Sequence, residues 1–461
     1  MNAAERQSLV REVQLAGNCS HPIRLSGEMV NLATGEVGVN SLRVACKDRR
    51  RVVCPACSYT YKADAWILVS SGLIGGKGTP EEVGTHPRLF VTLTAPSFGV
   101  VHTIKSHGGC IVRPRTSGTS TRRAQSSAHS GAQRDVQQHA HGAAPNDAQP
   151  GPPICTHGCA RFCSRRHEPG DPQLGRPLCE RCFDYDGAVL WNAHVARLWN
   201  NTIQTLRRLL AEAGGVAQSN LKAIAQVHYL KVAEIQRRGL VHLHVIVRVD
   251  GPDGVDAMPP AWLSAAVFAR VVGEAVRRAT VVGPRGLSLR WGKVLDVRDL
   301  GLASDDATRV ASYVAKYSTK TTDGSSELAH RFHSRRQIES LVDDPHARRL
   351  ALAAWDLGRR TDLESLHLGE HAHAFGFTGQ LITKSRGYST TFASLRAARV
   401  AHMASRRVAD PLEGTFHYDG RGYDDPRASE LAEVFFVMQR ELREEAAAAR
   451  RTRSVSSAEL S

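Results

Sequence analysis

The stretch QRRGLVHLHVIV, residues 236–247, decides the predicted fold, because it sets two histidines inside a run of branched aliphatic residues. The preceding run LKAIAQVHYLKVAEIQ is also rich in strand-forming residues, and RRG separates the two runs, so the pattern predicts an antiparallel hairpin. Side chains alternate along a strand, so His242 and His244 share one face and Leu243 points to the other. Such a pair can bind one ion, although two hydrogen-bonded histidines on a half-exposed strand give the same pattern.

Glu234 is the candidate third ligand. It lies eight residues before His242, across the predicted turn, so antiparallel pairing can bring its carboxylate to the histidine face. A slip of one residue in the register would turn it away. Two imidazoles and a carboxylate with open positions suit a divalent ion that also holds a phosphate oxygen, and we expect Mg²⁺ or Mn²⁺.

A second candidate element is DDATRVASYVAKYSTK, residues 305–320, which has a helical pattern. Tyr313, Lys316, Tyr317 and Lys320 fall at i, i+3, i+4 and i+7 and so lie along one helix face. A phenol is a poor nucleophile at neutral pH until nearby cations favour its phenolate, and the two lysines can supply that charge and neutralise a phosphate. The alternative is an amphipathic helix whose tyrosines pack with their hydroxyls toward solvent.

The cysteines predict two zinc sites. The chain has 10 cysteines, and thiols stay reduced in the cytoplasm, so pairs at CxxC spacing are interpreted first as metal ligands. Each set supplies four thiolates, enough for a closed tetrahedral site: Cys19, Cys46, Cys54 and Cys57 form the first, and Cys155, Cys163, Cys179 and Cys182 the second. Possible substitutes in the second set are Cys110, Cys159, His157 and His167. Buried free thiols are the alternative.

The first zinc site would also affect a basic run, KDRRR at residues 47–51. Bound zinc would stabilise segments that have little core of their own, and it could present this run to DNA phosphates. The same run is equally compatible with a solvated basic loop.

The remaining elements predict an α+β fold. A strand is expected at 88–95, and GAVLWNAHVARLWNNTIQTLRRLLAEAGG reads as a helix that ends at its Gly-Gly. After the hairpin we expect a helix at about 261–280, a strand near 287–297 and a helix at about 304–320. This order predicts one antiparallel sheet with helices packed on it.

The chain is expected to comprise seven segments. These are an N-terminal zinc-binding segment at 1–87, the first strand of the core at 88–105, a disordered insertion at 106–152, a second zinc-binding segment at 153–186, the rest of the core at 187–325, a helical region at 326–405, and a C-terminal helix with a loose tail of about ten residues at 406–461.

The charge of the chain favours a polyanionic partner. The 461 residues include 60 Lys and Arg against 45 Asp and Glu, a formal net charge of +15. Charge alone separates nucleic acid poorly from a membrane surface, but we favour nucleic acid. The sequence has no apolar run long enough to span a membrane and no signal-peptide pattern near residue 1, so we expect a cytoplasmic protein without a membrane partner.

Three ordered motifs carry a family resemblance: FVTLT at 90–94, HLH at 242–244 and YVAKYSTK at 313–320. They resemble the motifs of HUH endonucleases, the rolling-circle replication initiators. The wider text, including CPAC, FVTLTAPSFG, PLCERCFDYDGAVLWNAH and TKSRGYSTTF, is similar to replication initiators of actinobacterial plasmids and integrative conjugative elements. The similarity covers nearly the whole chain apart from the insertion and the tail.

The resemblance implies an HUH nickase core with a ferredoxin-like or RRM-like antiparallel sheet. Such an enzyme is a metal-dependent, site-specific single-strand endonuclease and strand transferase, and its partner is origin DNA, single-stranded or extruded as a hairpin. One tyrosine attacks a phosphodiester, frees a 3′ hydroxyl that primes replication and keeps the 5′ phosphate as a phosphotyrosine that can be religated. Tyr317 occupies the position of the nucleophile in one-tyrosine relatives, and Tyr313 would perform the second transfer.

Two other interpretations remain open at this stage. One is a non-catalytic zinc-ribbon DNA-binding regulator in which the histidines and tyrosines are structural. The other is an HUH relaxase or transposase, but relaxases usually carry a third histidine and tyrosines near the N-terminus, whereas here the tyrosines follow the histidine pair by about seventy residues. Whether a host helicase is recruited is left open by the sequence.

Overall fold

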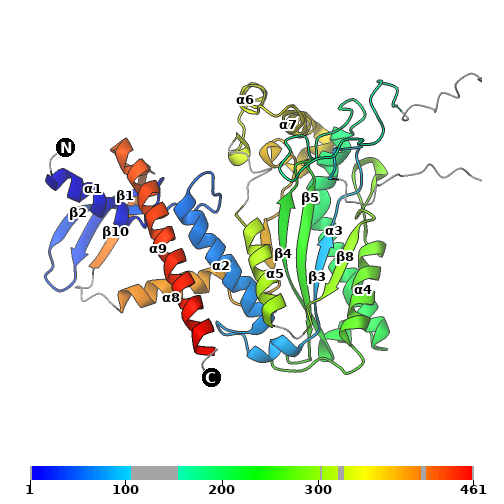
Figure 1. The fold of residues 1–461 in the computed structure, drawn as a ribbon, viewed down its shortest axis with the longest axis horizontal. Helices are drawn as coiled ribbons and strands as arrows, with labels where there is room; N and C mark the ends of the chain where they lie inside the picture. The colour runs from blue at the N-terminus through cyan, green and yellow to red at the C-terminus, as the bar shows by residue number, and fades with distance from the viewer. Residues whose placement is uncertain (1–2, 105–153, 302–303, 320–326, 406–411, 459–461) are drawn as a thin grey trace, which may run out of the picture. The chain divides into compact units, whose positions relative to one another are not determined.

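The structure is a computed structural model that describes residues 3–104, 154–301, 304–319, 327–405 and 412–458 (Figure 1). The chain divides into two compact units, one formed by residues 1–98 with 184–461 and the other by residues 99–183. The predicted disordered insertion, Lys320 and Cys110 lie outside the described residues. No helix among the described residues is long and apolar enough to cross a membrane.

The large unit is built around a five-stranded antiparallel sheet with strand order β8-β3-β5-β4-β9. The strands are β3 (Arg88–Leu93), β4 (Gln226–Ile235), β5 (Val241–Asp250), β8 (Leu295–Asp299) and β9 (Ile382–Lys384). Every residue of β5 is buried, which explains its near-continuous run of branched aliphatic residues. The predicted hairpin of β4 and β5 is therefore present, at the centre of the sheet.

The hairpin register sets which side chains meet. Glu234 on β4 pairs directly with His242 on β5, and Val232 pairs with His244. Directly opposed residues of an antiparallel pair point to the same face. The carboxylate and both imidazoles therefore lie on one face of the sheet, as the sequence predicts for the unslipped register.

Two helices cover that face and two cover the other (Figure 1). Helices α2 (Pro55–Ile74) and α5 (Ser304–Tyr317) share a core with Phe90, Leu230 and Ile246 of the sheet. Helix α3 (Tyr185–Ala213) lies on the opposite face, where the ring of Trp199 contacts Tyr229 of β4, and α4 (Ala265–Arg278) packs beside it. These layers confirm a mixed α+β architecture with antiparallel pairing.

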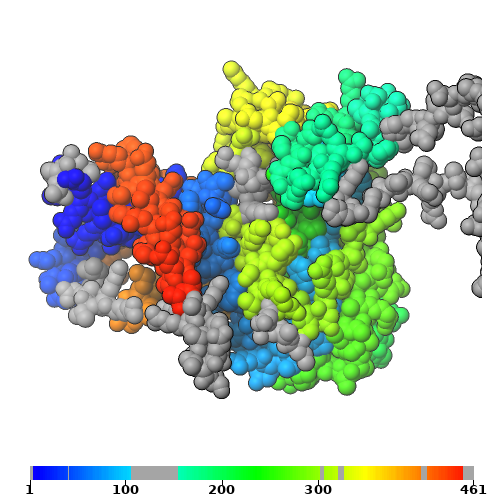
Figure 2. Space-filling model, in the orientation of Figure 1, coloured from blue at the N-terminus to red at the C-terminus, as the bar shows by residue number. Residues whose placement is uncertain are grey.

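A second, three-stranded sheet joins the two ends of the described chain. Its order is β10-β1-β2, from β1 (Ile23–Asn31), β2 (Val37–Val44) and β10 (Leu412–Arg421). Helices α1 (Ala3–Leu15) and α9 (Pro426–Ala458) pack together through Val13, Ala428 and Ala432, and the blue and orange-red segments lie side by side in Figure 2. Residues 1–87 and 406–461, which the sequence predicts to be separate segments, thus pack together in part.

Other elements differ from the sequence predictions. The strand expected near 287–297 is two short strands, β7 (Ser288–Arg290), which pairs with β6 (Thr280–Val282), and β8. The region 326–405 contains α6 (Arg335–Leu341), α7 (Pro345–Leu357) and α8 (Phe392–Ala404), but it also supplies β9. The prediction of a ten-residue loose tail was wrong for residues 452–458, because α9 continues to Ala458.

A buried ionic network ties α2 and the segment around Tyr388 to the sheet. Arg248 and Asp250 are fully buried neighbours on β5, joined by Arg248 Nε to Asp250 Oδ1 at 2.7 Å and Nη2 to Oδ2 at 2.9 Å. Nδ1 of His86 donates to the same carboxylate at 2.7 Å. Arg248 also donates to the backbone oxygens of Gly72 and, at 3.2 Å, Tyr388. The network holds α2 against the face of the sheet that carries the histidines.

We expect Asp250→Asn to lower the free energy of unfolding by about 3–5 kcal/mol, because it leaves the Arg248 charge buried without its counter-ion. Chemical denaturation at neutral pH measures this, with exposed Asp253→Asn as the control.

Burial alone would raise the pKa of Asp250, but hydrogen bonds from His86 and Arg248 lower it below its usual range. The contribution of the ionised Asp250 carboxylate to stability is therefore present above the unfolded carboxyl pKa of about 4. It is lost as the pH falls through the lower pKa of the folded state. A variant as stable as the control would contradict this account.

Candidate active site and cysteine clusters

The two tyrosines of α5 lie beside His244. The ring centroid of His244 is 4.6 Å from that of Tyr317 and 5.1 Å from that of Tyr313, and the two phenol rings are 4.9 Å apart. Helix α5 packs on the sheet through Ala307, Ala311 and Val314, which places the tyrosine stripe along the histidine face. Two segments about seventy residues apart in sequence thus meet at one site.

The histidines and Glu234 form the polar part of this site. Oε2 of Glu234 is 3.5 Å from Nε2 of His244, and the two histidine rings are 4.7 Å apart. Nδ1 of His242 and both ring nitrogens of His244 are buried without a hydrogen-bond partner among the described residues. A buried nitrogen without a partner is costly, and a metal ion is one ligand that removes the cost. These donors fit a divalent ion in type.

The donor atoms are not yet gathered as tightly as a bound ion requires. In the described chain, the donor atoms of His242, His244 and Glu234 do not all lie within 4.8 Å of one another. Binding one ion therefore requires the side chains to rotate from their present positions. The hairpin register already sets all three on the same face.

Burial controls the protonation of both kinds of group. Burial, with a smaller contribution from the neighbouring His244, lowers the pKa of His242 to about 4, so the ring is neutral and able to act as a ligand at neutral pH. Burial raises the pKa of Tyr317 above its ordinary value, with further contributions from Tyr313 and Glu234. The exposed Lys316 lines a separate groove with Tyr59 and Lys62. A role for Lys316 in favouring the phenolate therefore stays a prediction.

A cavity of about 240 Å³ opens beside Tyr317 and Glu234. Arg49 and Arg50 of the basic run at 47–51 line it, although the sequence did not place that run beside Tyr317. The sequence predictions missed three other lining residues, which come from a segment far from the hairpin: His371, His373 and Gln380. The HAH at 371–373 repeats the H-x-H pattern and is the signal that could have identified His371 and His373. The cavity brings guanidinium groups next to the candidate nucleophile and is large enough for a phosphate group.

The basic run at 47–51 reaches the end of α5. Arg49 Nη1 donates to the backbone oxygen of Ser318 at 3.5 Å, and the amide of Arg51 donates to Thr319 at 3.5 Å. Arg50 is held by Asp48, with Nε to Oδ1 at 2.9 Å. The run is therefore an ordered loop beside the tyrosine helix.

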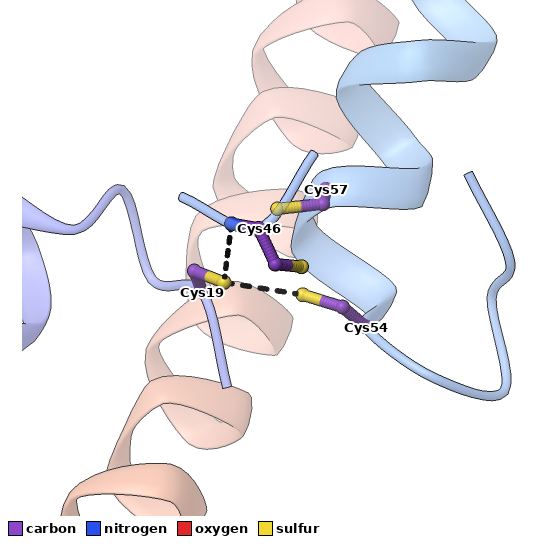
Figure 3. Close-up of side chains that lie close together, drawn as sticks. All are labelled: Cys19, Cys46, Cys54 and Cys57. Atoms are coloured by element: carbon purple, nitrogen blue, oxygen red, sulfur yellow. Dashed lines mark hydrogen bonds between the residues drawn. The ribbon is translucent and has the colours of Figure 1, made fainter. Parts of the chain in front are cut away.

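The first cysteine cluster brackets this loop. The sulfurs of Cys19, Cys46, Cys54 and Cys57 lie within 4.8 Å of one another, and their side chains point toward a common centre in Figure 3. All four are free thiols; the amide of Cys46 donates to Cys19 Sγ at 3.3 Å. The predicted ligand set is thus brought together, and four converging thiols fit a structural Zn²⁺ site.

The second cluster differs from the predicted set by one residue. Cys155, His157, Cys179 and Cys182 converge, with His157 Nδ1 3.2 Å from Cys182 Sγ. A tight turn, with the amide of Cys155 bonded to Cys159 O, keeps His157 close and places Cys159 beside Cys155 and Cys179.

Cys163 lies beyond that turn and contacts His102 and His167 instead. The second cluster therefore offers three thiols and an imidazole for Zn²⁺, and His157 was one of the substitutes that the sequence allowed.

Comparison with known proteins agrees with the sequence resemblance. A family model described as replication initiator protein, pSAM2, matches residues 5–435. A replication initiator protein of Streptomyces ambofaciens is 34% identical over 415 residues, which cover 86% of this chain and 78% of that protein. No solved structure matches the chain. This chain therefore belongs to the family of pSAM2 replication initiator proteins.

Proposed function

We propose that this replication initiator nicks one strand of its origin DNA by attack of Tyr317 on a phosphodiester, as HUH endonucleases do. The observation that carries the proposal is the contact between the tyrosine pair of α5 and His244 on the buried hairpin. His242, His244 and Glu234 would hold the ion. When bound, Mg²⁺ or Mn²⁺ supplies Lewis-acid polarisation of the phosphate.

The chemical step exchanges the phosphodiester bond for a phosphotyrosine bond and so conserves its energy. The phenolic oxygen of Tyr317 forms a bond to phosphorus while the bond from phosphorus to the 3′ oxygen breaks. The proton lost by the phenol is balanced by the proton gained by the leaving 3′ oxygen. The 5′ phosphate stays on the tyrosine, ready for religation. The ring of Tyr313 is 4.9 Å from that of Tyr317, which supports a second transfer in which Tyr313 attacks the strand.

Arg49 and Arg50 would bind backbone phosphates in the cavity beside Tyr317. Both guanidinium groups line it, on the loop bracketed by Cys46 and Cys54. This supports a role for the first zinc site in presenting the basic run to DNA. Phosphate contacts of this kind position a strand without reading its sequence.

Replacing both arginines by alanine is expected to reduce the dependence of single-strand binding on salt. For single strands, each lost phosphate contact makes the negative slope of log K against log salt shallower by about 0.7. The slope of the double variant should therefore be shallower by about 1.4. Fluorescence anisotropy with a labelled single strand at several salt concentrations measures the slope. Arg278→Ala on α4, where Arg278 pairs with Glu274, is the matched control. An unchanged slope in the double variant would remove these residues from the DNA site.

The nicking proposal is tested by incubating the full chain and Mn²⁺ with single-stranded oligonucleotides tiled across the DNA element that encodes it. We expect one oligonucleotide to form a protein–DNA adduct that survives denaturing electrophoresis and is absent with EDTA. A Tyr313→Phe/Tyr317→Phe double variant should form none, whereas Tyr418→Phe, which changes an exposed tyrosine on β10, should behave as the parent. Specific DNA binding without an adduct would favour a non-catalytic regulator. An adduct only at the ends of the element would favour a transposase.

A further inference from the structure

We propose that His102, Cys163 and His167 form a third metal site, which binds Zn²⁺ and lies in the unit of residues 99–183. The three donor atoms lie within 4.8 Å of one another and are distinct from the cluster of Cys155, His157, Cys179 and Cys182. The inference is independent of the nicking reaction, because it concerns how this unit is held together.

The spacing of the donors is close to that around one tetrahedral ion, with the nitrogen–nitrogen distance somewhat short. Nδ1 of His102 is 3.0 Å from Nε2 of His167, and Sγ of Cys163 is 3.5 Å and 3.3 Å from these two nitrogens. Zinc–nitrogen bonds of about 2.0–2.1 Å and zinc–sulfur bonds of about 2.3 Å at tetrahedral angles give donor separations of about 3.3–3.6 Å. One thiolate with two imidazoles favours Zn²⁺ over Mg²⁺ or Mn²⁺.

His167 is oriented as metal-binding histidines usually are. Its Nδ1 donates to Asp171 Oδ2 at 2.6 Å, which turns Nε2 toward Cys163 and His102. The carboxylate of Asp171 is fixed in turn by the amide of Gln173, which donates to Oδ1 at 2.8 Å. A carboxylate on the far nitrogen sets the ring orientation and raises its basicity as a ligand. The His167 side chain is also buried, at 3% exposure of the residue.

Apart from the cluster of Cys155, His157, Cys179 and Cys182, the unit has little else to stabilise it. Among its described residues, the buried ones are His167, Pro177 and Phe183. Backbone bonds connect its two described segments, from the amide of His102 to Arg176 O and from the amide of Gly175 to His102 O, both at 2.9 Å. A unit with so small a core usually needs metals or other cross-links to fold. A third ion would cross-link these same segments, with its fourth position open to water.

Metal analysis of the purified full chain tests the site. We expect three zinc ions per chain in the parent, and one fewer in Cys163→Ala and in His102→Ala. His402→Ala, which changes an exposed histidine on α8, is the matched control and should keep three. His102→Cys replaces one zinc ligand by another and should restore the third ion.

The outcomes separate the alternatives. Two ions in the parent, or an unchanged count in Cys163→Ala, would overturn the site and leave a hydrogen-bonded cluster without metal. If Cys163→Ala loses more than one ion because the unit unfolds, the zinc count of His102→Cys decides whether the third site exists. A count of three in that variant supports the site, and a count of two overturns it.

Discussion

Tyr317→Phe is expected to lower the rate of covalent adduct formation on the order of 10³-fold or more, because it removes the attacking oxygen and leaves the ring in place. The ring contact with His244 does not involve that oxygen, so folding and DNA binding should be retained. Single-turnover cleavage of the labelled origin strand measures the rate. The residual rate reports any attack by the neighbouring phenol.

Tyr313→Phe separates the roles of the two tyrosines. We expect it to form the first adduct at a near-parental rate and to lose the second transfer, measured as joining of a second labelled strand. Tyr418→Phe controls for a nonspecific effect of losing a phenol. Loss of the first adduct in Tyr313→Phe but not in Tyr317→Phe would reverse the proposed order. Loss only in the double variant would mean that the tyrosines are interchangeable.

His244→Ala is expected to lower the Mn²⁺-dependent cleavage rate by at least about 10²-fold, because both ring nitrogens of His244 are buried without a protein hydrogen-bond partner among the described residues. Origin binding without the divalent ion should stay near the parental level. A titration of cleavage rate against Mn²⁺ concentration separates weaker ion binding from a lower maximum rate. His417→Ala, on the exposed strand β10, is the matched control.

The pH dependence of this site follows from the burial of His242. Its pKa is lowered to about 4, so protons compete with the ion for the His242 ring only as the pH approaches that value. An ion requirement that is unchanged in His244→Ala would contradict the assignment of the histidine pair as ligands.

Local sequence patterns were sufficient for the elements that build the candidate site. The hairpin follows from two strand-forming runs joined by a short turn, and α5 follows from helical periodicity. Both patterns reside in contiguous residues, so periodicity alone reveals them. The sequence also supplied the four ligands of the first cysteine cluster, because its CxxC pair leaves few other partners.

What the sequence could not supply depends on contacts between distant segments. β10 pairs with β1 across nearly the whole chain, and β9 is a three-residue edge strand on β4. The positions of Arg49 and His373 at the cavity require the same long-range packing. The prediction that Cys163 joins the second cluster was wrong, because CxxC spacing identifies only two ligands, Cys179 and Cys182. The other two depend on the turn at Cys155, which the spacing does not reveal.

The central claim is that the tyrosine helix and the histidine hairpin act together on one phosphate. The most direct test is mass spectrometry of the proteolysed adduct formed by the parent chain on its origin strand. The account predicts a nucleotide joined through its 5′ phosphate to Tyr317, within the α5 peptide. A nucleotide attached to a residue outside α5 would contradict it.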